Sequence, residues 1–183
     1  VALSHDALTH SMFAMIEVFS IGPGDVYGLP VPMSHISGPM LLGTAMRSGM
    51  TLVLFERFVP ARFLDAAERH GMTLSHMVPP MAHALLHSRG EHRLPTFRSL
   101  LTFGMTASPE MLHQFHARWP HIGLSSGYGL TETGPLVVLG PAMFPPEKFG
   151  AVGHRLPYAG VRIVDDEGAD VPAGDSGEVW LSG

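Results

Sequence analysis

Between residues 26 and 126, short apolar runs alternate with segments whose apolar residues recur at helical spacing. This alternation limits the folds open to the chain, because parallel neighbouring strands need helical crossovers between them. The predicted strands are 26–31, 51–55, 73–78, 99–103 and 124–126. The predicted helices are 5–20, 37–47, 60–70, 79–88 and 108–119. The order predicts an α/β fold with a mainly parallel sheet flanked by helices.

The pattern changes after Gly140. Two further strands are predicted at residues 161–164 and 178–181, separated by turn-forming residues at 165–168 and 172–174. We therefore divide the chain into an α/β subdomain, residues 1–140, and a partial β subdomain, residues 141–183. The sequence starts at Val1 within an apolar segment and ends at Gly183 where a predicted strand runs into a turn, so both ends are expected to be cut from a longer protein.

Charge and composition exclude several classes of function. The sequence has 11 Lys and Arg against 16 Asp and Glu, a net charge of −5, and no basic run. It lacks the positive patch that a phosphate backbone requires, so no nucleic-acid partner is predicted. The absence of cysteine excludes disulfides and thiol nucleophiles and predicts a cytoplasmic protein. No run approaches the ~20 apolar residues of a membrane helix, so no membrane span is predicted.

The residues that indicate chemistry lie in the segment 125–134, with the sequence SSGYGLTETG. Its glycines allow a ligand to approach the backbone, and Thr131 and Glu132 place a hydroxyl beside a carboxylate. The segment follows a predicted strand, and open α/β sheets bind ligands at the carboxyl ends of their strands. A capped, glycine-rich turn between a strand and a helix is the alternative interpretation of this segment alone.

Four motifs in the same order resemble those of the AMP-forming, acid-activating adenylating superfamily, which includes acyl-CoA synthetases, aryl-CoA ligases, luciferases and peptide-synthetase adenylation domains. Residues 128–132, YGLTE, resemble its Tyr-Gly-x-Thr-Glu signature. Residues 30–38, PVPMSHISG, resemble its upstream Pro-Leu-x-His-x-x-Gly element, and residues 103–110, FGMTASPE, resemble its adenine loop. Residues 152–153, 161–165 and 174–183 resemble the run that enters a β-barrel subdomain, so the α/β part is expected to be followed by the start of a β-barrel-like unit.

The resemblance implies that the intact protein is an acyl-CoA synthetase. Such enzymes use ATP to convert a carboxylic acid into an acyl-adenylate and pyrophosphate, and a thiol, here that of CoA, then displaces AMP. By resemblance Glu132 holds Mg²⁺, Thr131 donates to the α-phosphate and His35 orients the carboxylate, and these three form the expected catalytic set. The residues expected to bind nucleotide are Gly104, Met105, Thr106, Tyr128, Gly129 and Thr131.

The resemblance also outlines an acyl pocket, with an apolar, methionine-rich lining that favours a fatty or other hydrophobic acid. Bulky Phe103 and Met105 stand where small residues are usual in the superfamily, which predicts a shortened pocket. The residues expected to line the pocket are His35, Met77, Val78, Pro79, Phe103, Met105 and Gly127.

The superfamily's phosphate loop, ribose-binding aspartate and catalytic lysine have no counterpart between Val1 and Gly183. The 183 residues alone are therefore expected to be inactive, and to self-associate through exposed cut surfaces. Two alternatives to the CoA ligase stay open. One is an adenylation domain that loads a carrier-protein thiol, and the other is a non-catalytic module that binds a nucleotide or an acyl group.

Histidine pairs offer a rival interpretation. His83 and His87 are four residues apart, and His113 and His116 three, which are spacings that allow chelation of a metal from one helix face. Neither pair is completed by a nearby carboxylate or cysteine, so ordinary surface histidines are the favoured interpretation.

Overall fold

The computed structural model describes residues 1–141 and 143–182. Its main feature is a seven-stranded sheet in the order β2-β1-β3-β4-β5-β6-β7. The first five strands in this order are parallel, and β5, β6 and β7 are joined in antiparallel fashion. The predicted α/β fold with a mainly parallel sheet is confirmed. The strands are β1 (Val26–Leu29), β2 (Thr51–Leu54), β3 (Leu74–Met77), β4 (Ser99–Thr102), β5 (Gly123–Tyr128), β6 (Val138–Leu139) and β7 (His154–Arg155).

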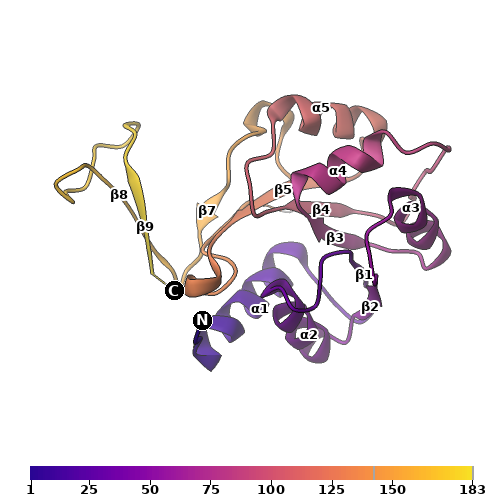
Figure 1. Ribbon diagram of the computed structural model, residues 1–183, viewed down its shortest axis with the longest axis horizontal. Coiled ribbons are helices and arrows are strands. Elements are labelled where there is room, and N and C mark those ends of the chain that lie inside the picture. Colours follow the sequence, from indigo (N-terminus) through magenta and orange to yellow (C-terminus); the bar gives the residue numbers. More distant parts are fainter. Residues whose placement is uncertain (142, 183) are drawn as a thin grey trace.

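Helices cover both faces of the sheet, so the molecule has three layers (Figure 1). One face packs against α1 (His5–Phe19) and α2 (Ser37–Ser48), where Met15, Phe19 and Leu41 are buried. The other face packs against α3 (Pro60–Arg69), α4 (Pro79–Leu86) and α5 (Pro109–Arg118). Each layer buries its own apolar cluster, which fixes the sheet between two sets of helices.

Local residue chemistry sets the helix ends. The Ser4 hydroxyl accepts a hydrogen bond from the Ala7 N–H over 3.1 Å, and the Ser108 hydroxyl accepts one from the Met111 N–H over 3.2 Å. Both contacts satisfy N–H groups that lack partners within a helix. The predicted serine caps of α1 and α5 are thus confirmed. None of the helices in the described part of the chain is both long and apolar enough to cross a membrane.

The register of β3, β4 and β5 aligns three side chains in one row across the sheet. His76 of β3 pairs with Leu101 of β4, which pairs with Ser125 of β5. Residues paired in a parallel sheet point to the same side, and successive residues of a strand point to opposite sides. His76, Leu101 and Ser125 therefore share the face toward α2, whereas Met77 belongs to the cluster on the opposite face.

The last part of the chain forms a separate two-stranded antiparallel sheet of β8 (Gly160–Val164) and β9 (Glu178–Ser182), which projects from the main body (Figure 1). The predicted strands are present, and Ile163, Val179 and Trp180 are exposed on this sheet. β7 lies in the large sheet although it follows residue 140. The division of the chain at residue 140 stays a proposal.

Candidate active site

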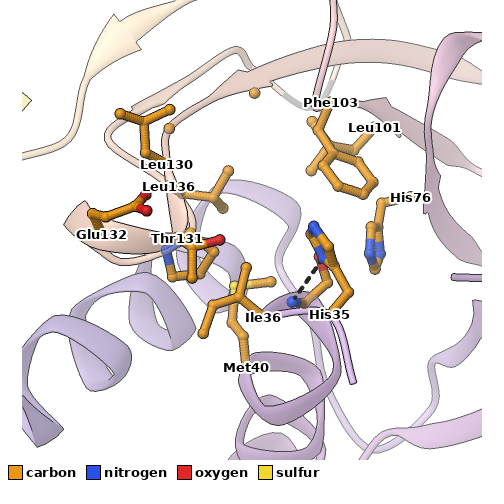
Figure 2. A pocket seen from close by; sticks show the side chains of 15 residues that line it. His35, Ile36, Met40, His76, Leu101, Phe103, Leu130, Thr131, Glu132 and Leu136 are labelled. Atoms are coloured by element: carbon orange, nitrogen blue, oxygen red, sulfur yellow. Dashed lines mark hydrogen bonds between the residues drawn. The ribbon is translucent and has the colours of Figure 1, made fainter. Parts of the chain in front are cut away.

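A cavity of about 260 Å³ opens at the carboxyl ends of β3, β4 and β5. The start of α2 closes one side, and a short 3-10 helix, η1 (Thr131–Thr133), closes another. Figure 2 shows Thr131 and Glu132 on one side of the cavity, and His76 and Phe103 on the opposite side. The lining residues are His35, Ile36, Ser37, Met40, His76, Leu101, Phe103, Gly104, Gly127, Gly129, Leu130, Thr131, Glu132, Pro135 and Leu136.

The loop after β5 presents the polar side of the cavity. The Leu130 N–H donates to the Thr133 hydroxyl over 3.2 Å, which closes the turn that carries Thr131 and Glu132. Glu132 is exposed, and its carboxylate makes no hydrogen bond or ion pair within residues 1–141 and 143–182. A free carboxylate at the mouth of a cavity suits Mg²⁺, which binds proteins through one or two carboxylates and takes its other ligands from phosphates and water.

His35 stands at the rim with one ring nitrogen already engaged. The Ser37 backbone N–H donates to His35 Nδ1 over 3.2 Å, and the Ser37 hydroxyl oxygen lies 2.9 Å from the same atom. Because a backbone N–H can only donate, Nδ1 acts as the acceptor and the ring proton belongs on Nε2. His35 therefore offers an N–H donor, and its ring lies 5.7 Å from that of Phe103 between centroids.

His76 lines the cavity but was not predicted as a site residue. It is 2% exposed, its Nδ1 lies 3.1 Å from Tyr27 Oη, and its Nε2 has no hydrogen-bond partner among the described residues. Burial lowers the pKa of His76 from 6.5 to about 3, with a smaller contribution from His35, so the ring is neutral near pH 7. The only sequence signal is a histidine inside an apolar strand.

Most of the predicted residues gather around two neighbouring hollows. The main cavity contains His35, Phe103, Gly104, Gly127, Gly129, Thr131 and Glu132. An adjoining hollow of about 160 Å³ is lined by Gly104, Met105, Thr106, Gly127, Tyr128, Gly129, Leu130 and Val152. Gly104, which lines both, has a φ of +81°, a conformation that favours glycine.

Four predicted acyl-site residues do not line the main cavity, and one of them, Met105, lines the adjoining hollow instead. Met77 is fully buried in the cluster against α3, α4 and α5, so the structure does not bring it to the cavity. Successive residues of a strand point to opposite faces of the sheet, so His76 points to the cavity face and Met77 to the other face. Val78 precedes α4 and approaches the Gly104 loop, and Pro79 lines a shallow hollow with Met105 and Thr106.

Neither histidine pair is completed by a third metal-ligating side chain among the described residues. His83 Nε2 lies 3.1 Å from His87 Nε2 on the exposed side of α4, and the rings of His113 and His116 pack beside Phe149. Within the described part of the chain, no group of three or more His, Cys, Asp or Glu side chains is positioned to hold a metal ion.

Comparisons with known proteins place this geometry in a family. The profile of the AMP-binding enzyme family matches residues 1–183. The 4-coumarate–CoA ligase 5 of Oryza sativa subsp. japonica is 31% identical over 194 residues, covering 100% of this chain and 36% of that protein. The 4-coumarate–CoA ligase-like 9 protein of Arabidopsis thaliana is 34% identical over 161 residues, covering 84% of this chain and 28% of that protein.

Solved structures agree with this assignment. The O-succinylbenzoate coenzyme A synthetase of Bacillus subtilis, in complex with ATP and magnesium ion, superposes with a TM-score of 0.87 at 26% identity, covering 98% of this chain and 37% of that one. The amide bond synthetase McbA of Marinactinospora thermotolerans gives a TM-score of 0.86 at 27% identity, covering 96% of this chain and 35% of that one. The chain thus spans about 36% of the length of the rice relative. Since the family profile matches its whole length, the chain belongs to the AMP-binding enzyme family.

Proposed function

We propose that the intact protein carrying this chain is an ATP-dependent, AMP-forming acid–CoA ligase for a hydrophobic carboxylic acid. A carboxylate oxygen attacks the α-phosphate of ATP, and pyrophosphate leaves with its electron pair. The CoA thiolate then attacks the acyl carbonyl carbon, and AMP leaves. The observation that carries the proposal is the arrangement of Thr131 and Glu132 opposite an apolar, ring-lined end of one cavity.

The residues at the polar side of the cavity have separate roles in the first step, the formation of the acyl-adenylate. Two anions must approach each other, so fixed donors and a cation are needed to offset their charge. The Thr131 hydroxyl donates to an α-phosphate oxygen, and the Nε2–H of His35 donates to the acid's carboxylate. Glu132 holds Mg²⁺, which when bound neutralises phosphate charge. The free carboxylate of Glu132 and the engaged Nδ1 of His35 support these roles.

The adjoining hollow suits the nucleotide. Tyr128 is exposed beside Met105 and Thr106, where its ring offers a stacking face for adenine. Gly104 and Gly129 line both hollows, so the phosphates of the nucleotide and the carboxylate of the acid would meet beside them. This arrangement supports a nucleotide site next to an acid site, with Met105 on the nucleotide side.

Two classes of hydrophobic acid remain candidates. The sequence favours a fatty acid, because no charged residue was expected in the pocket. An aromatic acid is the second candidate, because the cavity of about 260 Å³ is near the lower limit of ~300–1,000 Å³ for small-molecule sites and has the rings of His35, His76 and Phe103 along it. The curated relatives with 4-coumarate–CoA ligase names fit the second candidate.

Acid-dependent exchange of pyrophosphate into ATP tests the proposal. The intact protein is incubated with Mg²⁺, ATP and a series of fatty and aryl acids, and the exchange rate is measured for each acid. Exchange with at least one hydrophobic acid is expected, and exchange with none would refute a ligase and leave the non-catalytic binding module. Formation of the acyl thioester with free CoA, compared with a carrier protein, decides between the CoA ligase and the carrier-loading adenylation domain.

The isolated 183-residue chain is expected to produce no acyl-adenylate. Its hollows contain only some of the groups that would position ATP, and the reaction rate falls by orders of magnitude when one positioning group is missing. Exposed apolar side chains on β8 and β9 support self-association of this chain. Turnover by the isolated chain at the rate of the intact protein would contradict these assignments. The cytoplasm remains the proposed compartment.

A further inference from the structure

Two buried polar atoms in the described part of the chain have no hydrogen-bond partner, His76 Nε2 and Ser125 Oγ. Both residues lie in the row of side chains that runs across β3, β4 and β5 on the cavity face. Only His76 lines the cavity. An unpaired polar group in the interior costs free energy, and a ligand atom that forms a hydrogen bond with it would remove that cost.

The contact with Tyr27 determines what His76 can offer. Tyr27 Oη and His76 Nδ1 are 3.1 Å apart, and both residues are almost fully buried. If Nδ1 carried the proton and donated to Oη, the tyrosine hydroxyl hydrogen and Nε2 would both be unpaired. If the hydroxyl donates to Nδ1, only the Nε2–H is unpaired, so this tautomer is favoured.

The ring is also fixed in charge and position. Burial lowers the pKa of His76 to about 3, so a second ring proton is not bound at neutral pH. The ring lies 4.8 Å from that of Phe103 between centroids, at the side of the cavity away from Thr131 and Glu132 (Figure 2). His76 is thus a neutral, oriented donor beside Phe103, on the side of the cavity away from Thr131 and Glu132.

We propose that the Nε2–H of His76 donates a hydrogen bond to an oxygen atom in the hydrocarbon part of the acid, so that the site selects oxygenated hydrophobic acids over plain hydrocarbons. The oxygen can belong to an ether, a hydroxyl or a ketone, since each accepts a hydrogen bond. This inference rests on the proposed acid-activating function and names a substrate class within it. The selectivity arises because a hydrocarbon leaves the buried N–H unpaired.

A scan of acceptor position tests the proposal in the intact protein. One series contains fatty acids in which an ether oxygen replaces a methylene at successive positions, and another pairs a para-methoxy with a para-ethyl phenylpropanoic acid. Dissociation constants are measured by calorimetry, and kcat/KM by pyrophosphate exchange. We expect one ether position, or the methoxy acid, to be preferred about tenfold over its hydrocarbon match.

His76→Phe removes the donor and keeps a ring against Phe103, so the preference should fall to about onefold while plain acids still bind. His76→Leu serves the same purpose should the first variant fail to fold. Ser125→Ala is the matched control, because it removes the other unpaired group of the same row, away from the cavity, and should keep the preference.

The outcomes separate the two proposals. A preference that depends on His76 in binding, without any pyrophosphate exchange, would refute the ligase and support the donor role. Exchange with equal preference in the wild-type protein and His76→Phe would support the ligase and overturn the donor role. Failure of every acid to bind the wild-type protein would overturn both.

Discussion

Replacement of Gly129 by alanine should disturb the site through a backbone collision. A Cβ atom at this position would lie 2.6 Å from the Pro135 carbonyl oxygen, 3.0 Å from its carbonyl carbon and 3.1 Å from Leu136 Cα. These are backbone atoms of the segment that returns after η1, so the loop carrying Thr131 and Glu132 must shift. Overpacking of this kind costs about 1–3 kcal/mol of stability. A displacement near 1 Å at reacting groups lowers rates by about 10²-fold.

Urea unfolding and pyrophosphate exchange measure the two effects. Gly24→Ala is the matched control, because nothing lies within 4 Å of its added Cβ. We expect Gly129→Ala to lose about 1–3 kcal/mol in the free energy of unfolding and about 10²-fold in exchange by the intact protein, and Gly24→Ala to change stability by less than about 0.5 kcal/mol. The reasoning is refuted if the two variants behave alike in both assays.

Three further perturbations address separate residues. Glu132→Gln should abolish pyrophosphate exchange while acid binding and unfolding stay near wild type; exchange within a fewfold of wild type would remove Glu132 from the metal site. Phe103→Ala should enlarge the cavity and raise kcat/KM for bulkier acids by up to roughly fourfold per added methylene, the equivalent of ~0.8 kcal/mol, whereas an unchanged acid profile would contradict its wall position. Because the folded pKa of His76 is about 3 against 6.5 in the unfolded chain, the unfolded state binds the extra proton and stability falls as pH drops below 6.5. The loss approaches about 1.4 kcal/mol per pH unit, and urea titrations of His76→Phe should lack it; equal pH slopes would argue against a buried, neutral ring.

The alternating strands and helices could be predicted because each is encoded locally. Apolar runs, serine caps and prolines at first turns lie within a few residues of the structure they specify. The two-residue strands β6 and β7 were not predicted, because so short a segment carries no periodicity. They are strands only through pairing with β5 and with each other.

Side-chain direction within β3 could not be predicted, although its position could. All of its residues are buried, because helices cover both faces of a parallel sheet, and hydropathy then shows no alternation. Met77 and His76 were therefore indistinguishable as cavity residues in the sequence. The Asp25–Arg98 ion pair could not be predicted for a different reason, because its partners are far apart in sequence and meet at 3.1 Å only after the sheet forms.

The two cavity histidines share one hydrogen-bonding pattern, although one is exposed and the other buried. In His35 the Nδ1 acceptor is occupied by Ser37, and in His76 it is occupied by the Tyr27 hydroxyl, which leaves one Nε2–H on each ring. None of the described residues that line the cavity is a lysine or arginine, so under the proposed function these two N–H groups, and not a fixed positive charge, would face the acid. Neutral donors select by the position of acceptor atoms, because a hydrogen bond falls off steeply with distance and angle. Under the two proposals, the spacing of these N–H groups would set the separation between carboxylate and inner oxygen that an acid needs to satisfy both.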